Sequence, residues 1–117
     1  MIYFIDDDES VRRGFGMFLK SAGLDHKSFE SAEEFLSQCK PDSRDLLVLD
    51  MYLPGMNGCY LLKKFVTQNV HIPVIVITAS EDQQNREYCR EYGVKAYLRK
   101  PVDAEALLDL ISYNMPA

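Results

Sequence analysis

The sequence predicts an α/β fold in which a parallel five-stranded sheet carries helices on both of its faces. Five short apolar segments alternate strictly with five longer amphipathic segments along the 117-residue chain. Strands that alternate with helices in this way form parallel sheets, because each helix crosses back over the sheet to start the next strand. Two apolar segments, residues 45–50 and 72–80, are almost uninterrupted apolar runs, as expected of strands that are buried on both faces.

The expected elements follow from the apolar spacing and from the residues that begin and end each segment. The expected strands are residues 1–5, 25–29, 45–50, 72–80 and 95–101. The expected helices are residues 10–23, 31–39, 56–69, 81–93 and 103–114. No linker, internal repeat or low-complexity tract interrupts the alternation. We therefore expect one domain over residues 1–117, with no output domain in this chain.

Start and stop signals support the helices of the first half of the chain. The first helix carries apolar side chains at helical spacing and ends at Gly23, a residue type that commonly terminates helices. Gly14 and Gly16 lie inside it and should each cost about 1 kcal/mol relative to Ala. The second helix begins with Ser31 and Glu34, whose spacing is that of a capping box. The strand between these two helices is short and polar, which suits a sheet edge.

The helices of the second half differ in polarity. The third helix carries four residues that we expect to face inward: Leu61, Leu62, Phe65 and Val66. The fourth helix is polar, has little apolar face and stops at Gly93. We therefore expect the fourth helix to be loosely packed. The last helix begins at Asp103, a favourable N-cap residue.

The charge balance disfavours several classes of partner. The formal net charge of −5 argues against a nucleic acid or an anionic membrane surface, since both require clustered Lys and Arg. No segment is long enough to span a bilayer, and the N-terminus does not resemble a signal peptide. The three cysteines lack metal-ligand spacing. We expect reduced, mostly buried thiols in a cytoplasmic protein, with one reactive thiol as an open alternative.

Acidic and polar residues gather where the expected strands end. Asp6 and Asp7 end the first strand, and Asp50 ends the third. Thr78 ends the fourth strand, and Lys100 ends the fifth. Ligands of open parallel sheets bind beyond the carboxyl ends of the strands, near the point where the strand order reverses. If the order is 2-1-3-4-5, the first and third strands are neighbours at that point and the three carboxylates converge.

Three converging carboxylates repel one another, and a hard divalent cation such as Mg²⁺ would remove that penalty. In that interpretation Asp6 and Asp7 help to hold the metal, and Asp8 and Glu9 favour the N-terminus of the first helix. The alternative is that all four acids serve only as N-cap and first-turn residues of that helix.

Asp50 has the chemistry of a phosphoryl acceptor. A carboxylate can attack phosphorus and form an acyl phosphate. The metal and Lys100 would neutralise charge on the phosphoryl oxygens, and the Thr78 hydroxyl would hydrogen-bond one of them. Simpler explanations stay open for each residue alone, because Thr favours strands and Lys is common as a solvated charge at a strand end.

As a set, these residues resemble the receiver domain of two-component response regulators. The resemblance rests on Asp6–Asp7, on Asp50 within LDMYLPGMNG, on Thr78–Ala79 and on Lys100–Pro101, and it covers essentially the whole chain. It implies a flavodoxin-like (βα)₅ fold of strand order 2-1-3-4-5. It also implies a phosphoacceptor module of phosphorelay signalling, and not an enzyme.

The resemblance further implies how the phosphoryl group is received. Asp50 takes it from a phosphohistidine on a sensor histidine kinase or a phosphotransfer protein. Mg²⁺ is bound by Asp7, Asp50 and the backbone carbonyl of Tyr52, with Asp6 helping, usually through water.

The resemblance also implies a switch. Thr78 and Lys100 contact the phosphoryl group, Thr78 is drawn towards it, and Tyr97 changes rotamer. The face formed by the last strand and the last two helices then changes its partner preference. That face would control an output domain or a downstream effector, such as a transcriptional regulator in a longer protein, and a homodimer through it stays open.

Two positions depart from the usual pattern of this family. Tyr52 is bulky, and we expect it to slow attack by water on the acyl phosphate. Ser80 is a second site that tunes the lifetime of the acyl phosphate.

Three other classes of protein would require different residues. A phosphatase of the haloacid dehalogenase type would need an acid in place of Tyr52. An FMN carrier would need a phosphate-binding loop where residues 6–9 are acidic. A degenerate receiver would lack Asp50, the acid pair or Lys100, and this chain has all of them.

Overall fold

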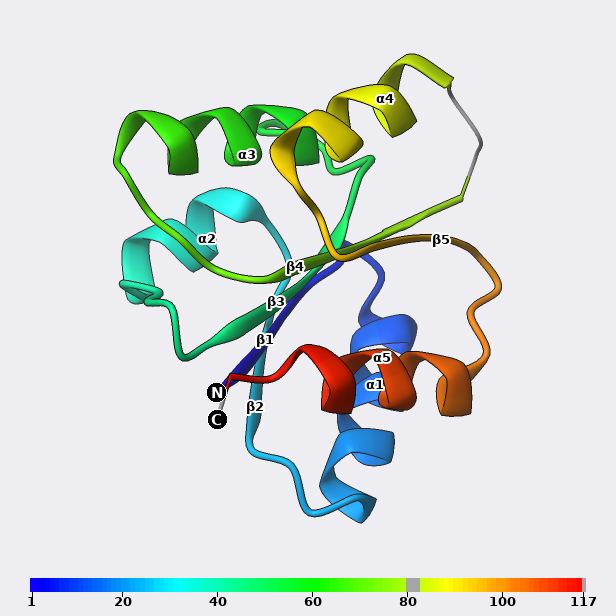
Figure 1. Cartoon of the computed structure of the whole chain (residues 1–117). Helices are drawn as coiled ribbons and strands as arrows, with labels where there is room; N and C mark the ends of the chain where they lie inside the picture. Colours follow the sequence, from blue (N-terminus) through cyan, green and yellow to red (C-terminus); the bar gives the residue numbers. More distant parts are fainter. Residues whose placement is uncertain (80–82, 117) are drawn as a thin grey trace.

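The computed structural model describes residues 1–79 and 83–116 and contains five parallel strands that alternate with five helices (Figure 1). The strands are β1 (Ile2–Ile5), β2 (His26–Phe29), β3 (Leu46–Asp50), β4 (Val74–Thr78) and β5 (Ala96–Arg99). The helices are α1 (Glu9–Ser21), α2 (Ala32–Gln38), α3 (Gly58–Thr67), α4 (Gln83–Tyr92) and α5 (Ala104–Asn114). The strand order is β2-β1-β3-β4-β5, so the predicted flavodoxin-like architecture is confirmed.

The pairing of the strands brings their carboxyl ends to one edge of the sheet. Ile5 pairs with Phe29 on one side and with Leu49 on the other. Asp50 pairs with Ile77 in β4, and Thr78 pairs with Arg99 in β5. Residues that follow directly after these pairs therefore meet at the same edge. The reversal of strand order lies between β1 and β3, as the sequence predicted.

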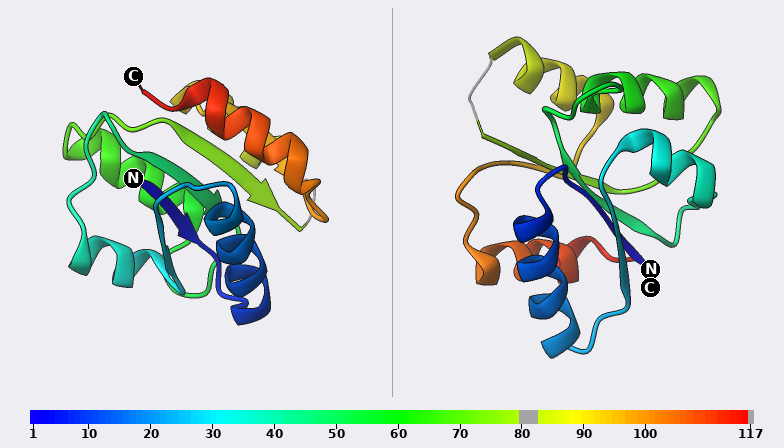
Figure 2. Two further views of the ribbon diagram at one scale, coloured as in Figure 1. Left: turned by 90° about the horizontal axis from the view of Figure 1, so that it is seen from below. Right: turned by 180° about the vertical axis from the view of Figure 1, so that it is seen from behind.

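Helices cover both faces of the sheet, and each face has its own apolar core. Helices α2, α3 and α4 lie on one side, and α1 and α5 lie on the other (Figures 1 and 2). The side chains of β3 alternate between the two cores: Leu47 and Leu49 face α2 and α3, whereas Leu46 and Val48 face α1 and α5. All residues of β3 and β4 are buried, which explains their almost continuous apolar sequence.

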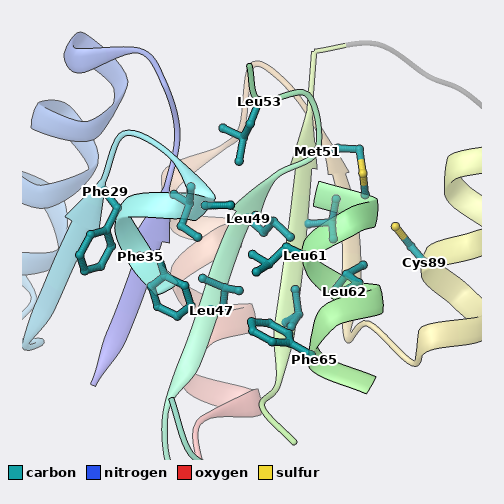
Figure 3. Close-up of a cluster of buried hydrophobic side chains, with 14 residues drawn as sticks. Phe29, Phe35, Leu47, Leu49, Met51, Leu53, Leu61, Leu62, Phe65 and Cys89 are labelled. Atoms are coloured by element: carbon teal, nitrogen blue, oxygen red, sulfur yellow. The ribbon is translucent and has the colours of Figure 1, made fainter. Parts of the chain in front are cut away.

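The core under α2 and α3 is built around aromatic rings (Figure 3). Phe35 is fully buried, and its ring meets Tyr3, Phe29 and Phe65 edge-on, with centroids 5.2 to 6.5 Å apart. Such edge-to-face pairs add about 0.5 to 1.5 kcal/mol each to the burial of apolar area. Helix α4 contributes the fully buried Cys89 to the margin of this core, and its Tyr88 and Tyr92 pack against the same core as partly buried side chains.

The predicted helix signals are confirmed at most ends. Asp8, Ser31 and Asp103 are N-cap residues, and their side chains accept hydrogen bonds from backbone N–H groups in the first turn of the helix. Gly23 and Gly93 have φ angles of 74° and 77°, a conformation that favours glycine at the end of a helix. The expected strand end at Ser80 and the expected helix start at Glu81 lie outside the described residues.

Two expectations about burial were only partly right. In α3, Leu61, Leu62 and Phe65 are buried as expected, but Val66 is 65% exposed, because it lies on the side of the helix that faces away from the sheet. Of the three thiols, Cys89 is fully buried, whereas Cys39 and Cys59 are half-buried. Burial raises the pKa of Cys89 to about 12, which keeps that thiol protonated.

None of the helices in the described part of the chain has both the length and the apolar content of a membrane span.

The glycines of the helices give an opposed pair of stability predictions. A Cβ at Gly14 would meet nothing within 4 Å, so Gly14→Ala should raise the free energy of unfolding by about 1 kcal/mol through helix propensity alone. A Cβ at Gly58 would lie 3.0 Å from the Cα of Met51, so Gly58→Ala should lower it by about 1 to 3 kcal/mol. Urea denaturation of the two variants and the wild type measures both changes. Equal effects of the same sign would contradict the packing described here.

Candidate functional site

Three carboxylates converge at the edge where β1 and β3 end. Asp6, Asp7 and Asp50 each present an oxygen, and these oxygens all lie within 4.8 Å of one another. Asp6 and Asp50 are buried, at 0% and 3% exposure, whereas Asp7 is exposed. The convergence predicted from the strand order is therefore confirmed, and the arrangement is more than a helix cap: Asp8, and not Asp6 or Asp7, caps α1.

The carboxylate of Asp6 is held at both of its oxygens. Oδ1 accepts a hydrogen bond from the backbone N–H of Asp8 at 2.9 Å, and Oδ2 accepts one from the ammonium group of Lys100 at 2.8 Å. The backbone carbonyl of Asp6 also accepts Nη1 of Arg12 at 2.7 Å. These bonds fix the turn from β1 into α1, and they leave Asp7, which is exposed, as the more accessible carboxylate of the pair.

Lys100 joins the carboxylates of two strands. It follows directly after β5, and its backbone N–H donates to the carbonyl of Thr78 at 2.7 Å. Its Nζ lies 2.8 Å from Oδ2 of Asp6 and 3.2 Å from Oδ2 of Asp50. One partly buried cation therefore faces two buried carboxylates, which keeps the pocket from holding three unbalanced negative charges.

The pocket shifts the titration of both partners. Burial, and next the negative charge of Asp6, raise the pKa of Asp50 above the ordinary carboxyl range, against an opposing effect of Lys100. Partial burial acts to lower the pKa of Lys100, but its hydrogen bond to Asp6 and the charges of Asp50 and Asp6 outweigh burial, so the pKa is raised. Lys100 is therefore cationic throughout the physiological range, and Asp50 ionises at a cost.

The donor set suits a hard divalent cation. Ligands of octahedral Mg²⁺ lie about 2.1 Å from the metal and so about 3 to 4 Å from one another. The carboxylate oxygens of the described pocket lie within 4.8 Å of one another, so small side-chain movements would bring them into range. All of these donors are oxygens, the ligand type that Mg²⁺ prefers.

The structure places the remaining predicted site residues in β4, in β5 and in the segment that follows β3. Thr78 is fully buried at the end of β4. Tyr52 follows Asp50 by two residues, and its backbone N–H donates to Oδ1 of Asp50 at 3.2 Å. Tyr97 lies in β5 opposite Val76, with a buried hydroxyl and the guanidinium of Arg86 5.8 Å from its ring centroid.

Two tyrosines of α4, Tyr88 and Tyr92, lie on the side of the helix that meets α3. Their rings pack 4.8 Å apart, and the ammonium of Lys63 lies 5.3 Å from the Tyr88 ring centroid. Both are partly buried against the core below α3. They therefore serve mainly as contacts between α3 and α4.

Sequence reasoning missed two side chains that organise the pocket. Arg12 anchors the carbonyl of Asp6, as described above. Asn85, in the first turn of α4, donates from Nδ2 to the hydroxyl of Tyr52 at 2.8 Å. The placement of Arg12 one turn after the Asp8 cap could have suggested its role. Nothing in the local sequence of Asn85 signals a contact with a residue 33 positions earlier.

The raised pKa of Asp50 predicts that this residue destabilises the metal-free fold. Above its raised pKa, ionised Asp50 costs stability, and the cost vanishes as the pH falls through that pKa into the ordinary carboxyl range. Asp50→Asn should therefore raise the free energy of unfolding at pH 7 in EDTA, because the uncharged amide removes this cost while Lys100 keeps its ion pair with Asp6.

Urea denaturation of the wild type and of Asp50→Asn, at pH 7 and in the acid range, measures this difference. It should shrink in acid, and saturating Mg²⁺ should stabilise the wild type more than the variant. Asp109→Asn, at an exposed position in α5, is the matched control. A less stable Asp50→Asn protein in EDTA at pH 7 would contradict the electrostatic description.

Comparison with known proteins agrees with this geometry. Nodulation protein W of Bradyrhizobium diazoefficiens is 34% identical over 111 residues, which cover 95% of this chain and 49% of that protein. Transcriptional regulatory protein FixJ of Azorhizobium caulinodans is 34% identical over 114 residues, which cover 97% of this chain and 54% of FixJ. The chain thus spans about half the length of these two curated relatives.

A solved structure and a family model extend the comparison. The structure of the response regulator StyR superposes with a TM-score of 0.90 at 36% identity, over 97% of this chain and 58% of StyR. The model of the response regulator receiver domain matches residues 2–112, a span that includes all five strands and the whole acidic pocket. The chain therefore belongs to the family of CheY-like response regulator receiver domains.

Proposed function

We propose that Asp50 accepts a phosphoryl group from the phosphohistidine of a sensor histidine kinase or a phosphotransfer protein, with Mg²⁺ bound beside it. The proposal rests mainly on the position of Lys100, whose Nζ lies 3.2 Å from Oδ2 of Asp50, one of three converging carboxylates. A cation beside the acceptor oxygen can neutralise the charge that the incoming phosphoryl oxygens bring. The protein is then a signalling switch that receives one group, and not an enzyme that turns over a substrate.

The transfer requires a nucleophile and balanced charge. An oxygen of Asp50 forms a bond to phosphorus as the bond from phosphorus to the donor imidazole nitrogen breaks, and the imidazole leaves with that electron pair. Lys100 then faces a phosphoryl oxygen as well as Asp6. The buried hydroxyl of Thr78 supplies a hydrogen bond to the phosphoryl group.

The metal site of the proposal uses residues of this chain only. Asp7, Asp50 and the backbone carbonyl of Tyr52 hold Mg²⁺, and Asp6 helps, usually through water, because its own oxygens are bonded to Asp8 and Lys100. Bound Mg²⁺ supplies positive charge that offsets the carboxylates and the phosphoryl oxygens.

Phosphorylation would be transmitted to the face formed by α4, β5 and α5. A dianionic group at Asp50 draws the Thr78 hydroxyl, and Tyr97 changes rotamer in the space beside β4. Helix α4 is polar and contributes one fully buried side chain among those described, Cys89. Such an element lies at the low-stability end of a fold and is readily biased by a local charge.

The partners follow from the family and its relatives. A receiver domain implies a histidine kinase upstream and an output domain or effector downstream. The name of FixJ states transcriptional regulation, and we infer a related output in a longer protein. The domain itself, with its net charge of −5, would bind neither nucleic acid nor a membrane directly. We place the reaction in the cytoplasm and leave a homodimer through α4, β5 and α5 as a further possibility of the same face.

Incubation with Mg²⁺ and acetyl phosphate, followed by intact mass spectrometry, tests the acceptor. The wild type should gain the mass of one phosphoryl group, because Asp50 is the nucleophile at the pocket. Asp50→Ala should gain nothing, and Asp109→Ala, which removes an exposed carboxylate of α5, should behave as the wild type. Unmodified wild-type protein, with Mg²⁺ binding shown independently, would overturn the proposal.

The ring of Tyr52 predicts a long-lived acyl phosphate. Because Tyr52 stands beside Asp50 and its hydroxyl is fixed to α4, the ring should hinder water at the phosphorus atom. Tyr52→Asn should shorten the half-life of the aspartyl phosphate about fivefold, equivalent to about 1 kcal/mol of barrier. Loss of the phosphoryl mass with time measures it, with Tyr60→Asn, at an exposed tyrosine of α3, as the control. Equal half-lives for wild type and Tyr52→Asn would remove this role.

A further inference from the structure

A hydrogen-bonded connection joins the acceptor loop to the first turn of α4 without passing through Thr78 or Tyr97. Tyr52 is tied to the pocket by its backbone, whose N–H donates to Asp50 at 3.2 Å. Its side chain reaches in the other direction, where Nδ2 of Asn85 donates to the phenol oxygen at 2.8 Å. One residue therefore contacts the acceptor with its backbone and α4 with its hydroxyl.

The amide of Asn85 is itself held in place. Its Oδ1 accepts a hydrogen bond from the thiol of Cys59, with the sulfur 3.4 Å away. The same sulfur lies 3.5 Å from Sδ of Met51. Met51 is fully buried and directly follows Asp50. The amide thus has its oxygen directed to α3 and its nitrogen directed to Tyr52. A donor that is oriented in this way is set to hold the Tyr52 hydroxyl in one position.

We infer that Asn85 is a positioning residue for the chemistry at Asp50: it fixes the ring of Tyr52 beside the acceptor and couples the position of α4 to the lifetime of the acyl phosphate. This inference rests on the proposed function for its kinetic consequence. Its structural part, a latch between Tyr52 and the first turn of α4, stands on the hydrogen bonds alone.

The weak packing of α4 makes a single hydrogen bond consequential. Cys89 is the fully buried side chain among those of α4 that the structure describes. Tyr88 and Tyr92 add partly buried rings. Loss of one hydrogen bond from a helix with one fully buried side chain should shift its opening equilibrium more readily than the same loss in a core helix.

The hydrogen bond gives a partner protein access to the acceptor. A partner that displaces the first turn of α4 would break the bond between Asn85 and Tyr52 and would thereby change how fast the phosphoryl group is lost. Through this latch, binding at the output face would change the lifetime of the acyl phosphate on Asp50. Any partner protein that binds over the first turn of α4 could act on Asp50 in this way.

The test separates the latch from its kinetic effect. Tyr52→Phe removes only the phenol oxygen, Asn85→Ala removes the amide, and the double variant removes both. Without any phosphodonor, hydrogen–deuterium exchange of α4 amides over residues 84–90 should be about fivefold faster in Tyr52→Phe than in the wild type, the size expected for one lost hydrogen bond. Unchanged exchange would overturn the latch, whether or not the protein can be phosphorylated.

The half-life of the acyl phosphate then tests the coupling as a double-mutant cycle. Each single variant should shorten the half-life about fivefold, and the double variant should be no faster than either single one, since both changes break one bond. Multiplied effects in the double variant, or unchanged half-lives, would overturn the coupling. Glu91→Ala, at an exposed position of the same helix, should leave exchange and half-life unchanged. A wild type that takes up no phosphoryl group would refute the proposed function and with it the coupling, while the exchange measurement still decides the latch.

Discussion

The ammonium group of Lys100 lies between the carboxylates of Asp6 and Asp50, and the arrangement of the whole edge depends on this pairing. Two carboxylates about 4 Å apart repel by about 4 kcal/mol at an effective dielectric constant near 20. A buried pair of this kind is tolerated because one cation, brought by a different strand, faces both. The Lys100 ammonium can also pair with additional negative charge. The ion pairs that stabilise the fold therefore also prepare the pocket for an anionic group.

The sheet delivers these residues to one place through its topology. Asp6 and Asp50 come from neighbouring strands on either side of the reversal in strand order, and Lys100 follows β5, two strands away from β3. Two separate apolar cores hold the sheet rigid from both faces. The firmly packed part of the molecule therefore carries Asp50, the proposed acceptor, and the less firmly packed α4 borders it. This contrast suits the proposed switch, since a local charge most readily moves an element that is weakly held.

Much of this could be predicted from the sequence, because periodicity and strand-end residues are local signals. The alternation of segments indicated the parallel sheet, and the position of Asp6, Asp7 and Asp50 at strand ends indicated their convergence. The strength of the Lys100 bridge was not predictable, since it depends on side-chain distances across three strands. The Asn85–Tyr52 bond was missed for the same reason: it joins residues that only the packing of α4 against α3 brings together. The partial exposure of Cys39 and Cys59 likewise reflects packing that apolar character alone does not determine.

A crystal structure with Mg²⁺ and beryllofluoride, a phosphoryl mimic, would show whether Asp50 is the acceptor. We expect beryllofluoride on an oxygen of Asp50, the metal ligated by Asp7, Asp50 and the carbonyl of Tyr52, and Nζ of Lys100 in contact with a fluoride. Beryllofluoride or metal bound elsewhere, or Lys100 still confined to Asp6 with no contact to the adduct, would contradict it.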